Sequence, residues 1–357
     1  MKCYIATYYK YNNYGTRLQN YALLYTLKNM GFDVETIYLN DSADNFKKFI
    51  KKVLSIFPVT NKQKMWFIDN KKGTVFKNFN NKLNYMYIDS MSLKELNGNN
   101  AIAIAGSDQI WSPLHLNNNK KDIDLFFLNF MDNSKRYTYA PSFGVEDIPL
   151  SMDNFYKENL KNFKMLSIRE ESGQKILNKL LNNKVDILPD PVFLLDKDEW
   201  DNNSKKSNNY ILTYFLGNNI DKRIKNIEEF AKNKNLKVIN IAGNEYINNC
   251  IIPNPDEFVQ LIHNADVVFT DSFHASAFSI IFNTPFYVYQ RDDVKQFSRI
   301  DSLLKDFNLE NRVISDNIDL DDLNDEFYVD ANKILEKKRL GLDYLKKIEK
   351  DYESNER

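Results

Sequence analysis

Short apolar runs alternate with longer segments of helical length along most of the chain. The runs Ala101–Ala105 (AIAIA) and Val267–Phe269 (VVF) contain no polar residue. Strands that are buried on both faces of a parallel sheet have this continuous apolar character. The segments between such runs, for example 17–30 and 220–233, are long enough for helices of about four turns. The alternation predicts an α/β fold with parallel sheets.

The alternation occurs twice, on either side of a segment at 201–209 that is rich in Asn, Lys and Ser and is typical of a linker. We therefore expect two Rossmann-like domains that face a cleft. The first domain covers residues 1–195, with a helical insertion at 41–95, and the second covers residues 205–320. A charged helical tail is expected at 321–357.

The composition argues against several classes of protein. The 357 residues are 43% hydrophobic, which suffices for two cores, and the net charge is −1. Because a nucleic-acid-binding protein usually carries a basic face, we expect no nucleic-acid partner. The two cysteines, Cys3 and Cys250, lie far apart, so neither a disulfide framework nor a zinc site is expected. The sequence has no HxH or HExxH pattern, and we expect no metal and no cofactor.

The first residues lead directly into a predicted strand, without the apolar segment of a signal peptide. No run of about 18 uninterrupted apolar residues predicts a transmembrane helix. We therefore expect a cytoplasmic protein with, at most, peripheral contact to the inner face of the membrane. The Lys- and Phe-containing segment 46–57 is the candidate for such contact, although an ordinary amphipathic surface helix is the simpler interpretation.

The segment Asp266–Gln290 carries the clearest chemical signal. Its first strand is followed by Asp271, Ser272, His274 and Ser276, which lie where a helix is predicted to begin. In open α/β sheets, ligands bind at the carboxyl ends of strands, and a helix N-terminus favours an anion. Histidine exchanges protons near neutral pH, so His274 is the candidate general acid/base. The alternative is a half-buried structural histidine beside a capping residue.

Polar residues also follow several other predicted strands. Arg169 can hold a phosphate or carboxylate through two parallel hydrogen bonds, or it can form a surface ion pair with Glu170 or Glu171. We expect the residues at these strand ends to face the same cleft as His274. They are Gly15, Ser107, Asp108, Gln109, Ser142 and Arg169.

Five motifs occur in an order that resembles the polysaccharide pyruvyl transferase family. They are NNYGTRLQNYAL (12–23), AGSDQIW (105–111), SIREESG (167–173), DPVFLL (190–195) and TDSFHASAF (270–278). The resemblance implies the two-domain GT-B architecture of glycosyltransferases. It also implies transfer of the pyruvyl unit of phosphoenolpyruvate onto two hydroxyls of a sugar. The products are a cyclic pyruvate ketal and phosphate, and the acceptor is a surface polysaccharide or its lipid-linked precursor, with galactose as the family-level expectation.

The resemblance also assigns roles on the donor side. It implies that His274 is the catalytic histidine and that Arg169 binds the phosphate of phosphoenolpyruvate. Some branches of the family carry an arginine two places before the histidine, where this chain has Ser272. That departure leaves a second anion contact unassigned. The candidates for it are Arg291, Arg299 and the N-terminus of the helix that follows His274. The alternative for both arginines is that they are surface residues.

In GT-B enzymes the first domain commonly holds the acceptor. Asn13, Gly15 and Gln19 are therefore candidate sugar contacts, because a glycine allows the backbone to approach a ligand closely. The alternative is that Gly15 serves only the turn and that Gln19 lies on a solvated helix face.

Ser107, Asp108 and Gln109 form a polar set after a buried strand, with Trp111 close in sequence. Aromatic and carboxylate side chains together suit the ring faces and hydroxyls of sugars. Asp108 is the candidate second proton acceptor for those hydroxyls, or it caps a helix.

Two other functions stay open. A nucleotide-sugar glycosyltransferase of the GT-B kind needs a nucleotide loop, for which Ala242–Glu245 (AGNE) is the candidate. A non-catalytic glycan-binding subunit of polysaccharide assembly is consistent with Ser272 in place of arginine. Binding and turnover of phosphoenolpyruvate separate these functions from pyruvyl transfer. The acceptor sugar, its linkage and the oligomeric state are not specified by the sequence.

Overall fold

The computed structural model describes most of the chain, with short gaps. The residues outside the description are 11, 41–59, 99, 117–119, 183–184, 202, 204–208, 219, 245–248, 291–297, 324–325 and 356–357. The chain divides into two compact units. The first unit comprises residues 1–41, 80–195 and 332–357, and the second comprises 42–79 and 196–331.

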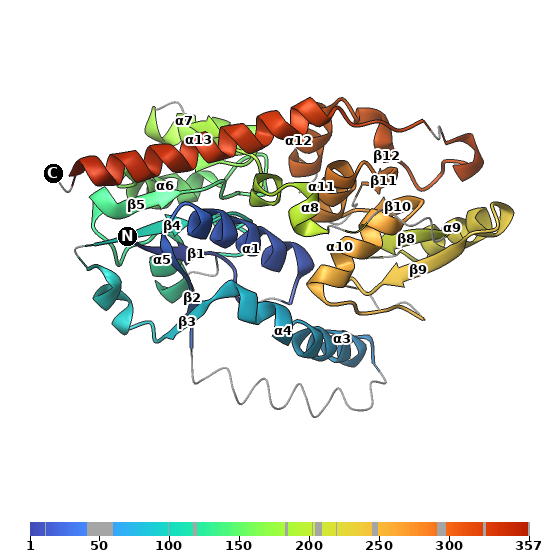
Figure 1. Cartoon of the computed structure of the whole chain (residues 1–357), viewed down its shortest axis with the longest axis horizontal. Coiled ribbons are helices and arrows are strands. Elements are labelled where there is room, and N and C mark those ends of the chain that lie inside the picture. The colour runs from blue at the N-terminus through green and yellow to red at the C-terminus, as the bar shows by residue number, and fades with distance from the viewer. Residues whose placement is uncertain are drawn as a thin grey trace. The chain divides into compact units, whose positions relative to one another are not determined.

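The first unit is built on a five-stranded parallel sheet with the strand order β3-β2-β1-β4-β5 (Figure 1). This is the order of a Rossmann fold, and it reverses direction between β1 and β4, which is where such sheets bind ligands. The strands are β1 (Lys2–Ala6), β2 (Asp33–Leu39), β3 (Tyr85–Ile88), β4 (Ala101–Ala105) and β5 (Arg136–Thr138).

A two-stranded parallel sheet continues this architecture beyond β5. It is formed by β6 (Ser167–Ile168) and β7 (Asp186–Ile187), and a parallel bridge between Tyr137 and Met165 joins it to the edge of the larger sheet. The carboxyl end of β6 is therefore next to that of β5, where the amide of Arg169 donates to the carbonyl of Pro141 at 3.0 Å.

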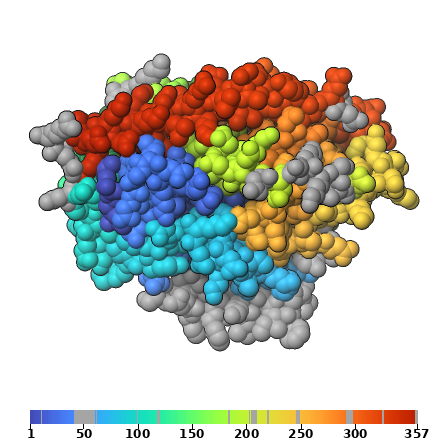
Figure 2. All heavy atoms as spheres, in the orientation of Figure 1, coloured from blue at the N-terminus to red at the C-terminus, as the bar shows by residue number. Residues whose placement is uncertain are grey.

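Helices cover the sheet of the first unit. The C-terminal helix α13 packs on it through Tyr344, Leu345 and Ile348, which share a buried cluster with Cys3 and Ile5 of β1. Figure 2 shows this helix in red beside the blue N-terminal region. The helices of this unit are α1 (Tyr14–Asn29), α5 (Lys120–Phe126), α6 (Asp153–Leu160), α7 (Glu171–Leu181) and α13 (Ala331–Asn355).

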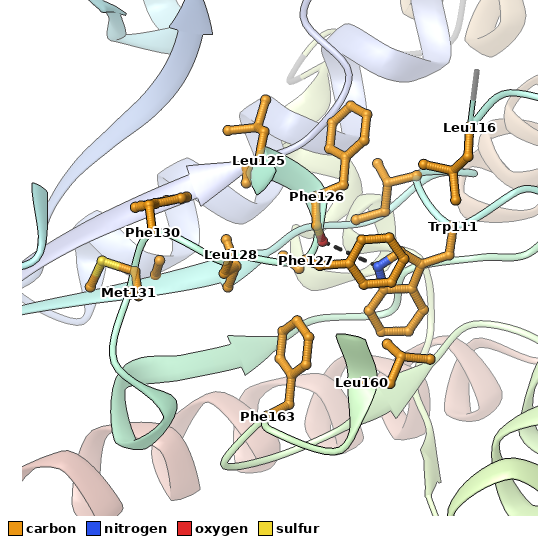
Figure 3. Packing of buried hydrophobic residues seen from close by; sticks show 14 of the residues in the cluster. Trp111, Leu116, Leu125, Phe126, Phe127, Leu128, Phe130, Met131, Leu160 and Phe163 are labelled. Carbon is orange, nitrogen blue, oxygen red and sulfur yellow. Dashed lines mark hydrogen bonds between the residues drawn. The ribbon is translucent and has the colours of Figure 1, made fainter. Parts of the chain in front are cut away.

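An aromatic core lies beneath the loop that follows β4. Trp111 is fully buried, stacks on Phe127 with the ring centroids 6.0 Å apart, and donates its indole N–H to the carbonyl of Phe126 at 3.2 Å (Figure 3). Since its ring is enclosed by Phe127, Phe143 and Phe163, Trp111 fills the core. Its burial rules out the ring-face contact with a sugar that its position beside Asp108 suggested.

The second unit contains another five-stranded parallel sheet, with the order β12-β11-β10-β8-β9. A parallel bridge between Ile241 and Ile251 adds one further residue pair beyond β9. The order of this sheet reverses between β8 and β10, so this pair of strands is the position for a ligand. The strands are β8 (Tyr210–Tyr214), β9 (Lys237–Ile241), β10 (Val267–Thr270), β11 (Phe286–Tyr289) and β12 (Val313–Ile314).

The helices between these strands are amphipathic or fully buried. Every residue of α11 is buried, which explains the apolar character of the segment that follows His274. The helices that begin in this unit are α3 (Asn61–Val75), α4 (Lys77–Asn80), α8 (Lys197–Trp200), α9 (Asp221–Asn233), α10 (Pro255–Asn264), α11 (Phe273–Phe282) and α12 (Ser298–Phe307).

The predicted fold class, α/β with two Rossmann-like domains, is confirmed. The segment 41–95 differs from the prediction because it contains the strand β3 as well as helices. Its residues Tyr85–Ile88 pair with Thr36–Leu39 of β2, so the sheet itself selects an extended conformation that the local pattern did not indicate. The segment 46–57 lies outside the described residues. No described helix is both long enough and apolar enough to cross a membrane.

Candidate active site

The loop between β10 and α11 is organised by its own polar residues. Ser272 is the N-cap of α11, and its hydroxyl accepts from the amide of Ala275 at 3.4 Å. The amide of Ser272 donates to the hydroxyl of Thr270 at 3.0 Å, and the hydroxyl of Ser276 donates to the carbonyl of Ser272 at 3.0 Å. Ser272 therefore serves the helix terminus, as capping serines do. This role accounts for the serine at this position.

Asp271 connects the two strands at which this sheet reverses. Its carboxylate accepts from the amide of Leu216 at 2.6 Å and from the amide of Gly217 at 2.7 Å. Both amides belong to the loop after β8, and Asp271 is 1% exposed. Such charge-assisted bonds hold an ionised carboxylate firmly. Asp271 thus fixes the geometry of the loop in which His274 lies.

His274 is the second residue of α11, at the carboxyl end of β10. Its side chain is mostly buried, and its ring packs edge-to-face on Phe273 with the centroids 5.2 Å apart. The first turn of a helix has unpaired amides and a partial positive charge, which favour an anion beside it. A histidine in this turn has the position of a proton donor or acceptor for an anionic ligand.

In the first unit, Arg169 follows β6 and forms an ion pair with Asp190. The side chains are 3% and 0% exposed, and the bond joins Nη1 to Oδ2. Nη2 of Arg169 lies 3.8 Å from Oδ1 of Asp108. Burial lowers the pKa of Arg169, but the charges of Asp190, Asp108 and Glu170 outweigh that effect, so the pKa is raised. Arg169 therefore does not form the surface ion pair with Glu170 that the sequence suggested. Its partner is Asp190, which is buried and lies 21 residues away along the chain.

Asp108 lies in the loop that follows β4 and contacts the first turn of α1. Oδ2 accepts from the hydroxyl of Thr16 at 2.9 Å, and Oδ1 accepts from the amide of Gln109 at 2.9 Å. Its backbone has φ of 77°, which is rare for a residue other than glycine. Strained backbone of this kind clusters at functional sites. No helix begins at Asp108, so its carboxylate does not serve as a helix cap.

The loops near Asp108 contain three more predicted site residues, Ser107, Gln109 and Ser142. Their side chains make hydrogen bonds or packing contacts within these loops. The hydroxyl of Ser107 donates to the carbonyl of Ala140 at 2.9 Å. Ser142 donates to Oε1 of Glu170 at 2.9 Å, and the same oxygen accepts from the amides of Phe143 and Gly144. A Cβ on Gly144 would lie 2.0 Å from Nε2 of Gln109, so glycine is needed for this packing.

The residues of the first strand-to-helix turn also have structural partners. Asn13 is the N-cap of α1, and its side chain accepts from the amide of Thr16 at 3.3 Å. Gly15 lies in the first turn of α1 and is buried. Gln19 is fully buried and donates to the hydroxyl of Thr7 at 3.0 Å. The alternative that Gln19 lies on a solvated helix face is therefore wrong, because its side chain is buried and links α1 to the end of β1.

The remaining predicted residues lie elsewhere. Arg299 is half-buried in the first turn of α12, and Arg291 lies outside the described residues. Gly243, in the loop considered for a nucleotide, packs closely on the residue that follows β8, because a Cβ would lie 1.6 Å from the carbonyl oxygen of Phe215. Asn244 donates to the carbonyl of Leu216 at 2.8 Å. Close packing explains this glycine without a nucleotide.

The sequence assigned no role to Asp190 or Thr16, and it suggested Glu170 only as a surface partner of Arg169. Asp190 begins the DPVFLL motif, and its position before a proline at a strand end was the available signal. Glu170 follows Arg169 directly but points its carboxylate to the loop of Ser142. Partners so distant along the chain cannot be recognised without the fold.

No group of three or more His, Cys, Asp or Glu residues that could hold a metal ion occurs in the part of the chain that the structure describes.

The chain matches the polysaccharide pyruvyl transferase family over residues 13–293 and belongs to that family. The comparison with curated proteins gives no match.

Several solved structures are similar in fold. The UDP-GlcNAc 2-epimerase of Methanocaldococcus jannaschii is 13% identical, with 95% of this chain and 98% of that chain covered and a TM-score of 0.49. A functionally uncharacterised protein of Klebsiella pneumoniae is 13% identical, with coverages of 88% and 91% and a TM-score of 0.46. The glycosyltransferase of kitacinnamycin is 12% identical, with coverages of 99% and 94% and a TM-score of 0.40. Similarities at this level assign no substrate to the chain.

Proposed function

We propose that the protein transfers the pyruvyl unit of phosphoenolpyruvate onto two hydroxyls of a sugar in a surface polysaccharide or its lipid-linked precursor. Membership of the polysaccharide pyruvyl transferase family supports this function. The observation that carries it is the position of His274, in the first turn of α11 and at the strand end where the second sheet reverses.

The reaction forms two carbon–oxygen bonds at the central carbon of phosphoenolpyruvate and breaks the bond from that carbon to the phosphate oxygen. The two sugar hydroxyls lose two protons, and the methylene carbon gains one proton when it becomes a methyl group. The other proton leaves with the phosphate. His274 delivers the proton to the methylene carbon and receives one from an attacking hydroxyl, which is general acid–base catalysis.

Anion binding is the second requirement, because phosphoenolpyruvate carries a phosphate and a carboxylate. The N-terminus of α11, capped by Ser272, offers backbone amides and the positive end of the helix dipole. This terminus is our candidate for the contact that an arginine supplies in other branches of the family. Arg169 remains the candidate for the phosphate, and its pair with Asp190 holds the guanidinium in place.

Asp108 is proposed as the acceptor of the second hydroxyl proton. Thr16 and Gln109 fix its carboxylate, and its side chain is 13% exposed, in contrast to the fully enclosed Asp190. Gln19, Ser107 and Ser142 have internal partners, and we assign them to the support of this carboxylate and of the loops around it.

The test is phosphate release from phosphoenolpyruvate by the purified protein, measured with and without a galactose-containing acceptor. Acceptor-dependent release supports the proposal. Transfer from a nucleotide sugar, with phosphoenolpyruvate inert, would favour a glycosyltransferase. Neither activity, together with glycan binding, would favour a non-catalytic subunit.

A further inference from the structure

Arg17 is a buried arginine whose hydrogen bonds to the described residues go to neutral groups. It lies in α1 just after the N-cap Asn13 and is 3% exposed. Nε donates to the side-chain oxygen of Asn80 at 2.9 Å, and Nη2 donates to the carbonyl of Tyr9 at 3.1 Å. Nη1 has no hydrogen-bond partner among the described residues.

Within the described part of the chain, no acidic side chain balances the positive charge of Arg17. Among the residues that the structure describes, no carboxylate pairs with its guanidinium. A buried charge without a counter-charge costs several kcal/mol of stability, so such residues are normally paired. The N-terminus of α1 adds to the positive potential at this point. An unpaired buried cation at a sheet reversal therefore indicates a site for an anion.

Tyrosine rings connect this cation to the surface. The guanidinium of Arg17 lies 6.0 Å from the ring centroid of Tyr85. Tyr38 is 5.4 Å from Tyr85 and 4.8 Å from Tyr87, measured between ring centroids. Tyr87 is 65% exposed and lies opposite Tyr38 in the register of β2 and β3. An exposed aromatic ring beside half-buried ones presents an apolar face with polar hydroxyl groups, which is the kind of surface that a sugar ring fits.

Burial raises the pKa of Tyr85, while the positive charge of Arg17 acts in the opposite direction. The cation of Arg17 and the phenol of Tyr85 therefore lie in one cluster in the first unit.

We propose that Arg17 binds the phosphate of a glycosyl phosphate or diphosphate acceptor, whose sugar ring packs on Tyr38 and Tyr87. This proposal rests on the proposed function, because it specifies the acceptor as a phosphate-linked sugar. The phosphate belongs either to a lipid-linked or to a nucleotide-linked sugar, which present the same group to the arginine. An arginine suits it because its planar fork matches phosphate oxygens.

The test compares galactose 1-phosphate with methyl galactoside in calorimetric titrations without phosphoenolpyruvate. We expect the wild-type protein to bind the phosphate ester at least about tenfold more tightly. Arg17→Gln should bind the two ligands equally, and Tyr87→Ala should weaken both. Asn80→Ala is the matched control, because it removes a partner of Arg17 and leaves the charge, so the phosphate preference should persist.

Equal affinity of the wild-type protein for the two ligands would overturn the proposal. This comparison needs no variant, so the test does not depend on whether Arg17→Gln folds. Arg17→Gln with an undiminished phosphate preference would also overturn it. If Arg17→Gln loses affinity for phosphoenolpyruvate and keeps it for galactose 1-phosphate, the arginine belongs to the donor site and the proposal is wrong.

The source of the phosphate follows from competition. Displacement of galactose 1-phosphate by UDP-galactose identifies a nucleotide-linked acceptor, and displacement by a short-chain prenyl diphosphate galactose identifies a lipid-linked one. If neither compound displaces galactose 1-phosphate, the proposal is wrong. Phosphate release from phosphoenolpyruvate is measured separately, so a failure of pyruvyl transfer and a failure of the Arg17 site are distinguishable.

Discussion

Arg169 and Asp190 form an ion pair that is almost completely removed from solvent, although 21 residues separate them along the chain. Asp190 also accepts from the amide of Val192 at 3.1 Å, and Ser107 lies 3.4 Å from the same carboxylate. The pair therefore joins the ends of β4, β6 and β7. Its charges hold Arg169 and Asp108 in fixed positions.

Asp190→Asn should lower the free energy of unfolding by about 3–5 kcal/mol, because it leaves Arg169 buried with a weaker counter-charge. Urea unfolding measures the change. The control is Asp33→Asn, at the exposed pair with Lys2, which should cost less than about 1 kcal/mol. Equal costs for the two variants would contradict the structural role of the buried pair.

Arg169→Ala should destabilise the first unit in the same way and should also weaken the binding of phosphoenolpyruvate. Asp190→Asn separates the two effects, because it disturbs the pair and leaves the guanidinium present. We expect calorimetry to show a loss of affinity of at least about tenfold for Arg169→Ala beyond that of Asp190→Asn. Equal losses would mean that Arg169 only supports the loops.

The N-terminus of α11 offers a test that depends on charge alone. Ser272→Asp and Ser272→Asn both keep a good N-cap, so their stabilities should agree within about 1 kcal/mol. If phosphoenolpyruvate lies at this terminus, the added carboxylate of Ser272→Asp repels it. We expect about tenfold weaker binding than for Ser272→Asn. Indistinguishable affinities would place the anion elsewhere.

Lys72 gives the second unit a pH-dependent stability. It is 5% exposed and donates to the carbonyl of Gly243 at 3.2 Å, and burial lowers its pKa to about 8 from 10.5, while the charges of Asp69 and Cys250 oppose the shift. Between these pH values the unfolded chain binds more protons than the folded one. The free energy of unfolding therefore rises with pH across that window.

Lys72→Met should stabilise the protein at pH 7 by about 2–3 kcal/mol, which is the cost of the charge less one hydrogen bond. The gain should shrink as the pH approaches 10.5. Lys71→Met is the control, since Lys71 is exposed, and it should change stability little at any pH. Parallel pH profiles for wild type and Lys72→Met would refute the assignment.

The sequence predicted the fold class because unbroken apolar runs report directly on strands buried on both faces. It also predicted which strand ends carry polar residues, since these are adjacent to the runs. It did not predict β3, whose extended form depends on pairing with Thr36–Leu39. It did not predict that Arg169 pairs with Asp190, or that Trp111 is enclosed by phenylalanines, because these contacts join distant segments.

His274→Ala should reduce phosphate release by at least about a hundredfold while phosphoenolpyruvate binding stays nearly intact, because the side chain moves protons and does not hold the anion. His274→Gln should be equally inactive. The matched control is His115→Ala, at an exposed histidine, which should leave the rate unchanged. Full activity in His274→Ala would refute the acid/base role.

The most direct measurement of the central claim is calorimetric titration of the purified protein with phosphoenolpyruvate, with UDP-galactose as the comparison ligand. Pyruvyl transfer predicts that phosphoenolpyruvate binds the wild-type protein and that Arg169→Ala loses this binding. Binding of UDP-galactose with no detectable binding of phosphoenolpyruvate would contradict it and favour a glycosyltransferase.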